Sequence, residues 1–264
     1  MAESLTKSER EEAVLRQVGR AMGAFSMLRP GDRVAVGVSG GKDSLCLVHA
    51  LAAYRRRAPF SFEVIAVTVD QGKFTAPAAA LGEVFRRIGV PWVFREEPRT
   101  LRLVADGTAH GCDVCSRLRR GALYAIAGEL GSTVLALGHT ADDCAEALLR
   151  NVLFNGRIAA LPPVAASRKG PIRVIRPLVY VSEEQTGSYV RAAGIEPIGC
   201  VCQEKDGPRR EIRSFLASMK ASHPDIGESV MSALANVTPY TLFDPRLRKE
   251  GADLPAFSTA AGNI

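Results

Sequence analysis

The sequence predicts an α/β protein built on a doubly wound parallel sheet of about five strands. Short runs rich in Val, Ile, Leu and Ala alternate with longer segments whose apolar residues recur every three to four positions. One apolar run, at residues 34–38, leads directly into a Gly-Gly turn and then into a helical pattern. A chain of 264 residues that is 47% hydrophobic and 23% charged can also bury a sizeable core.

Each expected strand is a short apolar run that ends at a turn signal, and the runs cover residues 34–38, 62–69, 91–94, 133–137 and 172–178. The expected helices carry an apolar stripe and lie at about 8–25, 42–57, 76–88, 142–153, 182–194, 208–222 and 226–237, with one more beginning at residue 112. Ser8 with Glu11, and Ser182 with Gln185, form expected capping boxes.

This order divides the chain into four parts. They are an N-terminal helix (1–30), the α/β domain (31–180), a C-terminal helical part with the late cysteines (181–244) and a tail without apolar periodicity (245–264). No apolar run is long enough to span a membrane, and the N-terminus lacks the apolar core of a signal peptide. We therefore expect a cytoplasmic protein.

The turn after the first strand has the composition of a phosphate-binding loop. Adjacent glycines let a bulky anion approach the backbone, and the N–H groups of the following helix converge there with the positive end of its dipole. A lysine and two hydroxyl groups add further donors. The expected phosphate ligands are Ser39, Gly40, Gly41, Lys42, Asp43 and Ser44.

This loop differs from the two common nucleotide-binding patterns. A Walker A loop requires Gly where this chain has Val36, and Ser or Thr where it has Asp43. The three spaced glycines of a dinucleotide fingerprint are also missing. The pattern Ser-Gly-Gly-Lys-Asp-Ser instead resembles the loop of the ATP pyrophosphatases, the PP-loop enzymes, which split ATP between its α and β phosphates.

Polar residues also follow the second and fourth expected strands. Asp70 ends the second, and Gly138 and His139 end the fourth. Because ligands bind at the carboxyl ends of parallel strands, these residues and the loop are expected to share one crevice. Asp142 and Asp143 then open a helix, where they either bind Mg²⁺ or simply complement the helix dipole. The spacing leaves both interpretations open.

Six cysteines in a cytoplasmic chain point to metal or catalytic thiols before disulfides. Cys112 and Cys115 begin a helix, and Cys200 and Cys202 lie far downstream. Four such sulfurs suit zinc, three suit an iron–sulfur cluster with one open iron, and a pair suits a redox disulfide. Because residues two apart in an extended segment face the same side, geometry does not choose between Cys200 and Cys202 as a third ligand. The two other cysteines, Cys46 and Cys144, lie in apolar helices and are expected to pack as small hydrophobes.

Taken together, these motifs resemble the tRNA 2-thiocytidine synthetase (TtcA-type) family of the PP-loop ATP pyrophosphatase superfamily. The resemblance extends from the N-terminal helix to about Asp244. Besides the phosphate loop, it covers the run from Cys112 to Tyr124, Gly138-His139 with Asp142-Asp143, Leu161-Pro162-Pro163, residues 175–178 and the Cys200 region.

The resemblance implies an adenine nucleotide alpha hydrolase-like fold that binds ATP, Mg²⁺ and a [4Fe-4S] cluster. It implies adenylation of the C2 oxygen of a cytidine in the tRNA anticodon loop, followed by replacement of that oxygen with sulfur. The implied partners are tRNA and a sulfur donor such as a cysteine desulfurase, with a homodimer kept open. The net charge of +6 and the pI near 9.1 favour a polyanionic partner, for which Arg55–Arg57, Arg209–Arg210 and Arg213 are candidate contacts.

The family's functional residues are carried over by position. Lys42, Asp43 and Asp143 are the expected catalytic residues. Nucleotide contacts beyond the loop are expected at Val67, Asp70, Arg119, Gly138 and His139. The implied cluster ligands are Cys112, Cys115 and Cys200, with Cys202 as the alternative third ligand.

The chain departs from the family pattern at two places. Thr140 and Ala141 stand where the family usually has His-Arg, and Cys200-Val201-Cys202 replaces a Cys-x-x-Cys pair. Two alternatives are therefore kept. One is a related PP-loop tRNA-modifying enzyme, for uridine thiolation or lysidine formation, with zinc or structural cysteines. The other is a non-catalytic module that binds nucleotide or tRNA.

Overall fold

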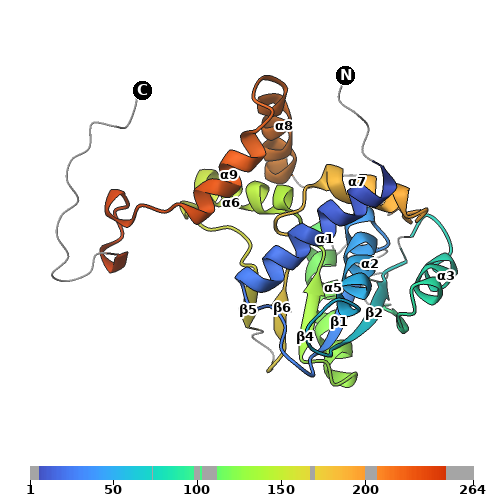
Figure 1. Cartoon of the computed structure of the whole chain (residues 1–264). Helices are drawn as coiled ribbons and strands as arrows, with labels where there is room; N and C mark the ends of the chain where they lie inside the picture. The colour runs from blue at the N-terminus through green and yellow to red at the C-terminus, as the bar shows by residue number, and fades with distance from the viewer. Residues whose placement is uncertain are drawn as a thin grey trace.

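The computed structural model describes residues 6–72, 74–97, 102, 112–166, 170–199 and 207–247, with only the backbone described at 112–115 and 240. Its centre is a six-stranded sheet in the order β3-β2-β1-β4-β6-β5 (Figure 1). The strands are β1 (Arg33–Val38), β2 (Glu63–Asp70), β3 (Trp92–Glu96), β4 (Val134–Leu137), β5 (Val164–Ala166) and β6 (Arg173–Ile175). The predicted α/β class with a mainly parallel sheet is confirmed.

The sheet holds one strand more than expected. β5 pairs antiparallel with β6 at the sheet edge, whereas all other neighbours are parallel. β6 is shorter than the predicted run because Pro177, which has no N–H to donate, lies in the turn that follows it.

Helices cover both faces of the sheet. The helices are α1 (Lys7–Ala24), α2 (Lys42–Arg55), α3 (Ala79–Arg87), α5 (Cys112–Glu129), α6 (Ala141–Asn155), α7 (Glu183–Ala192), α8 (Gly207–Ser222) and α9 (Ile226–Ala235), of which α8 and α9 pack against α6 rather than on the sheet. Alternate side chains of β1 point to opposite faces of the sheet and belong to two different hydrophobic cores. Val34, Val36 and Val38 pack with α1, α2, α3 and α7, while Ala35 packs beneath α5. In the described part of the chain, no helix is long and apolar enough to cross a membrane.

One expected capping box is misplaced and the other is confirmed. α1 is capped by Thr6 and Glu9 rather than by Ser8 and Glu11, because the helix begins at Lys7 and Ser8 already lies inside its first turn. α7 is capped by Ser182 and Gln185 as predicted.

The sheet topology fixes where the crevice lies. The chain runs from β1 outward to β2 and β3, and then returns to the other side of β1 with β4. The switch point therefore lies between β1 and β4, and it brings the carboxyl ends of β2, β1 and β4 next to one another.

Candidate nucleotide site

The loop between β1 and α2 is closed by hydrogen bonds among its own residues. The Ser44 hydroxyl donates to the Gly41 carbonyl (2.9 Å) and accepts from the Ser39 backbone N–H (3.1 Å). Gly40 has φ +81°, and a Cβ there would lie 3.1 Å from the Ile198 carbonyl oxygen. Glycine is therefore required by both backbone conformation and space. The loop presents its backbone at the start of α2, as a phosphate site requires.

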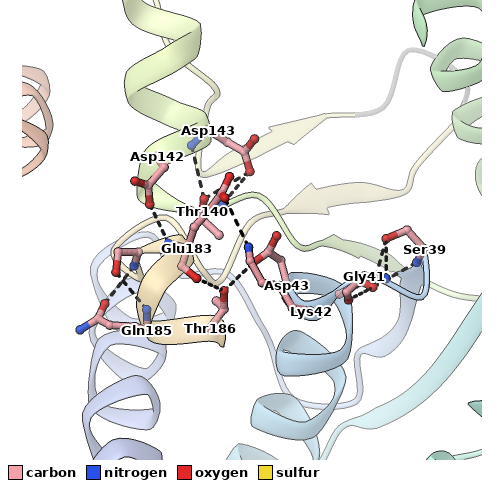
Figure 2. A network of polar contacts seen from close by, with 12 residues as sticks. Ser39, Gly41, Lys42, Asp43, Thr140, Asp142, Asp143, Glu183, Gln185 and Thr186 are labelled. Atoms are coloured by element: carbon pink, nitrogen blue, oxygen red, sulfur yellow. Dashed lines mark hydrogen bonds and ion pairs between the residues drawn. The ribbon is translucent and has the colours of Figure 1, made fainter. Parts of the chain in front are cut away.

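Lys42 and Asp43, at the start of α2, face α7 (Figure 2). The Lys42 ammonium lies 2.8 Å from Asp43 Oδ1 and 3.4 Å from a Glu183 carboxylate oxygen. The Thr186 hydroxyl donates to the same oxygen of Asp43. The lysine is thus held at the rim by two carboxylates.

The end of β4 approaches the same helix start. A Cβ at Gly138 would lie 3.2 Å from backbone atoms of Asp43 and Ser44, so the two segments are in close contact. His139 follows, and its Nδ1 is buried without a hydrogen-bond partner among the described residues. Burial lowers the pKa of His139 to about 4, which leaves the ring neutral at physiological pH.

Asp142 and Asp143 open α6 beside these residues (Figure 2). Asp143 Oδ2 accepts from the Thr140 backbone N–H (3.0 Å), and the Thr140 hydroxyl accepts from the Asp143 N–H (3.3 Å). Asp142 accepts from the backbone N–H of Glu183 (2.7 Å). Both acids therefore stabilise helix starts, and Thr140 is the N-cap residue. This cap leaves Oδ1 of Asp143 free of the capping box and directed to other partners.

The carboxylates fit Mg²⁺ in one limited way. The described residues contain no group of three or more His, Cys, Asp or Glu side chains that could hold a metal ion. Mg²⁺ commonly binds through one or two carboxylates and substrate phosphates, with waters completing the shell. Asp43 in the loop and Asp143 at the start of α6 suit that mode.

Of the other expected nucleotide contacts, two lie at the edge of the sheet and one is buried in the core. Asp70 ends β2 and accepts from the Gly72 N–H (2.7 Å), and Arg119 of α5 donates to the side chain of Gln71 (3.1 Å). Both residues therefore lie at the carboxyl edge of the sheet. Val67 is fully buried in the core beneath α5.

The cysteines divide into two sets. Cys46 and Cys144 are buried as predicted, and burial raises the pKa of both thiols, that of Cys144 to about 11. Cys112 and Cys115 lie in the first turn of α5, where only the backbone is described, and Cys200 and Cys202 lie outside the described residues. The chain just before Cys200 is tied to the site, because the Ile198 N–H donates to the Gly40 carbonyl (2.9 Å) and the Gly199 carbonyl accepts from the Thr75 N–H (3.0 Å).

An ion-pair network that the sequence did not indicate covers the carboxylates. Arg209 of α8 donates to Asp143 Oδ1 (2.8 Å) and to Glu146 (3.1 Å). Arg213 donates to Glu146 and to Glu183, at 2.5 Å each. Both guanidinium groups are paired with carboxylates of the protein but stay partly exposed, at 40% and 36% of the side chains, so contact of Arg209 and Arg213 with tRNA phosphates stays a prediction.

The fold and the loop define a nucleotide-binding protein of the PP-loop class. The family model for the PP-loop domain matches residues 11–198. The tRNA-cytidine(32) 2-sulfurtransferase of Anaeromyxobacter sp. (strain K) is 39% identical over 248 residues, which are 92% of this chain and 85% of that protein. The same enzyme of Burkholderia mallei (strain SAVP1) is 38% identical over 258 residues, covering 92% and 78%. The chain belongs to the tRNA-cytidine(32) 2-sulfurtransferase family.

A solved structure agrees with the fold. The U34-tRNA thiolase NcsA from Methanococcus maripaludis, determined with its [4Fe-4S] cluster, superposes with a TM-score of 0.69 at 22% sequence identity. The match covers 86% of this chain and 80% of that chain.

Proposed function

We propose that this chain is an ATP-dependent tRNA sulfurtransferase that converts a cytidine of the anticodon loop to 2-thiocytidine. The observation that carries the proposal is the shared edge of the sheet. The phosphate loop and the acids of α6 follow the carboxyl ends of β1 and β4, and Arg119 of α5, the helix that begins with the Cys-x-x-Cys pair, contacts Gln71 just after β2. Family membership supports tRNA as the substrate.

The first chemical step is adenylation of the base. The oxygen on C2 of cytosine is a poor leaving group, and its attack on the α-phosphorus of ATP breaks the bond to the bridging oxygen and releases pyrophosphate. Backbone N–H groups of the loop would stabilise the charge that develops on the phosphates. Lys42 would move away from its partners Asp43 and Glu183 and neutralise the same charge. Asp43 and Asp143 would hold Mg²⁺. In the second step a sulfur nucleophile forms the C2–S bond as the C2–O bond to AMP breaks.

This proposal predicts the products of ATP. ATP labelled at the α-phosphate should yield AMP and pyrophosphate only when tRNA is present, and tRNA from cells without the protein should lack 2-thiocytidine. Lys42→Ala and Asp143→Ala should each lower turnover at least about 100-fold, because each removes charge stabilisation at the phosphates. Arg86→Ala, on the exposed face of α3, is the control. ADP as the main product would contradict the assignment.

The cysteines fit an iron–sulfur cluster by donor chemistry. Cys112 and Cys115 are three residues apart at a helix start, where the dipole favours thiolates. Cys200 directly follows Gly199, whose carbonyl accepts a hydrogen bond from the backbone N–H of Thr75, after β2. A cluster held by Cys112, Cys115 and Cys200 would supply an iron without a protein ligand, at which sulfur can be bound. The proposed ligands come from the start of α5 and from the position that follows Gly199.

The ligand set can be tested by metal analysis. Anaerobically prepared protein should contain iron and sulfide, and Cys112→Ala, Cys115→Ala and Cys200→Ala should each lose iron. Cys202→Ala is the matched variant and should keep it. Loss of iron in Cys202→Ala but not in Cys200→Ala would reverse the assignment of the third ligand. Zinc bound by all four cysteines would contradict the cluster.

A further inference from the structure

Two arginines of α8 connect this helix to the carboxylates of the nucleotide site. Arg209 and Arg213 are four residues apart and therefore lie on one face of the helix. Their partners Asp143 and Glu146 are nearly buried, with 13% and 7% of the side chains exposed. A third partner, Glu183, also contacts Lys42, so charge contacts run without a break from α8 to the phosphate loop.

The two oxygens of Asp143 have different partners. Oδ2 belongs to the capping box with Thr140, so the orientation of the carboxylate is fixed without α8. Oδ1 accepts from Arg209. A cation that binds at Oδ1 must therefore share that oxygen with a guanidinium or displace it, because two cations at hydrogen-bond distance repel each other.

Glu146 gives Arg209 a second acceptor. Its Oε2 lies 3.1 Å from Arg209 Nε, and its Oε1 is held by Arg213. Arg209 can therefore release Asp143 and remain paired, at the cost of one of the contacts that hold α8.

Loss of the Arg209–Asp143 ion pair matters because α8 has few other contacts that hold it. Ile212 is the one buried residue of the helix, and Phe215 is 50% exposed. A groove of about 1320 Å³ separates parts of α8 and α9 from α1 and α7. In Figure 1, α8 and α9 stand outside the layered body, next to α6. With so little apolar contact, the ion pairs carry much of the attachment of α8.

We propose that Arg209 and the Mg²⁺ of the bound nucleotide compete for Asp143 Oδ1, so that nucleotide binding loosens α8. The proposal rests on nucleotide binding at the loop, as proposed above. Linkage makes the coupling reciprocal: if Mg²⁺–nucleotide weakens the attachment of α8, then the attached α8 weakens Mg²⁺–nucleotide binding by the same factor. Arg209 is thus a residue that sets nucleotide affinity, without itself touching the phosphates.

The test uses the full chain, Mg²⁺ and α,β-methylene-ATP, which cannot be split between the α and β phosphates. Calorimetry without tRNA gives the affinity at several Mg²⁺ concentrations, and hydrogen exchange gives the protection of residues 207–222. Arg209→Gln removes the competing charge. Arg210→Gln is the matched control, because Arg210 is exposed on the same helix and makes no ion pair among the described residues.

We expect Arg209→Gln to bind the Mg²⁺ complex about three- to tenfold more tightly than the unaltered chain, and Arg210→Gln to bind it equally. In the unaltered chain, the analogue should speed exchange in residues 207–222. In Arg209→Gln, exchange there should be fast already and should change little on binding.

Weaker binding by Arg209→Gln, or equal binding by the two variants, would overturn the competition. Slower exchange of α8 in the unaltered chain on binding would overturn it as well. This result counts even if α8 is already detached in the Arg209→Gln variant. An unaltered chain that does not bind the analogue at all would instead contradict the proposed function, and with it this inference.

Discussion

His139 places an imidazole at the end of β4 where little water reaches it. Because burial disfavours the charged ring, its pKa falls from the ordinary value near 6.5 to about 4. The unfolded chain therefore binds a proton between these two values that the folded chain does not. Folding stability contributed by the neutral ring is present above pH 6.5 and is lost as the pH falls toward 4.

This difference predicts an acid-sensitive component of stability. Urea unfolding at pH 7.5 and pH 4.5 should show that the unaltered protein loses on the order of 2–3 kcal/mol more than His139→Gln does. His223→Gln is the control, because His223 is exposed and its replacement removes no buried imidazole. Equal losses in all three proteins would exclude His139 as the source.

Asp143 shows why the sequence predicted the residues of the site but not all of their partners. The sequence pattern left a role in complementing the helix dipole and a metal role equally open, and the structure adds a capping box through one carboxylate oxygen. The second oxygen meets Arg209, which is 66 residues away in sequence and belongs to no recognisable motif with it. Local spacing can indicate which residue types gather at a site, but not which distant cation pairs with them.

At the scale of elements, Asp32 joins three strands at the edge opposite the nucleotide site. The residue precedes β1, and its side chain accepts from the Thr133 hydroxyl (2.7 Å) before β4 and from Arg173 (2.5 Å) in β6. The Arg29 backbone N–H donates to it as well (2.7 Å). Only 7% of the Asp32 side chain is exposed.

Removing this carboxylate should therefore be costly. Asp32→Ala leaves Arg173 with 21% exposure and without its anion, so we expect a loss of about 3 kcal/mol in the free energy of unfolding by urea. Glu63→Ala is the matched control, because the Glu63–Arg33 pair lies at the same edge but is 68% and 45% exposed, and should cost less than about 1 kcal/mol. Similar costs for the two variants would show that burial of the pair is unimportant.

Elements with a strong pattern were predictable, and weak ones were not. β1, β2 and β4 lie within a few residues of the predicted runs because each is a mostly buried strand with a nearly continuous apolar sequence. β3 was also predicted, from its Trp92-Val93-Phe94 run, although it is an edge strand without a buried residue. β5 lies at an edge and has only three residues, directly after Pro162-Pro163, so its apolar run is too short to indicate a strand. α3 begins at Ala79 rather than at 76, after Pro77.

At the scale of the whole molecule, the net charge does not indicate which cations pair within the protein. The chain carries +6, which favours a polyanionic partner. However, Lys42, Arg173, Arg209 and Arg213 are paired with carboxylates of the protein. Composition counts charges and not their partners, so the phosphate loop and the parallel sheet were predictable while the network between α6, α7 and α8 was not.

The backbone bond between Gly40 and Ile198 has a consequence for how this family can vary. Main-chain hydrogen bonds to residues 40 and 75 fix residues 198 and 199, and Cys200 comes one peptide unit later. An insertion between Ile198 and Cys200 would shift every following thiol relative to the phosphate loop, whatever side chains it carried. An insertion in residues 203–206 would leave that spacing unchanged, since it falls after both thiols. Insertions before Cys200 should therefore be poorly tolerated, whereas insertions after Cys202 should be tolerated.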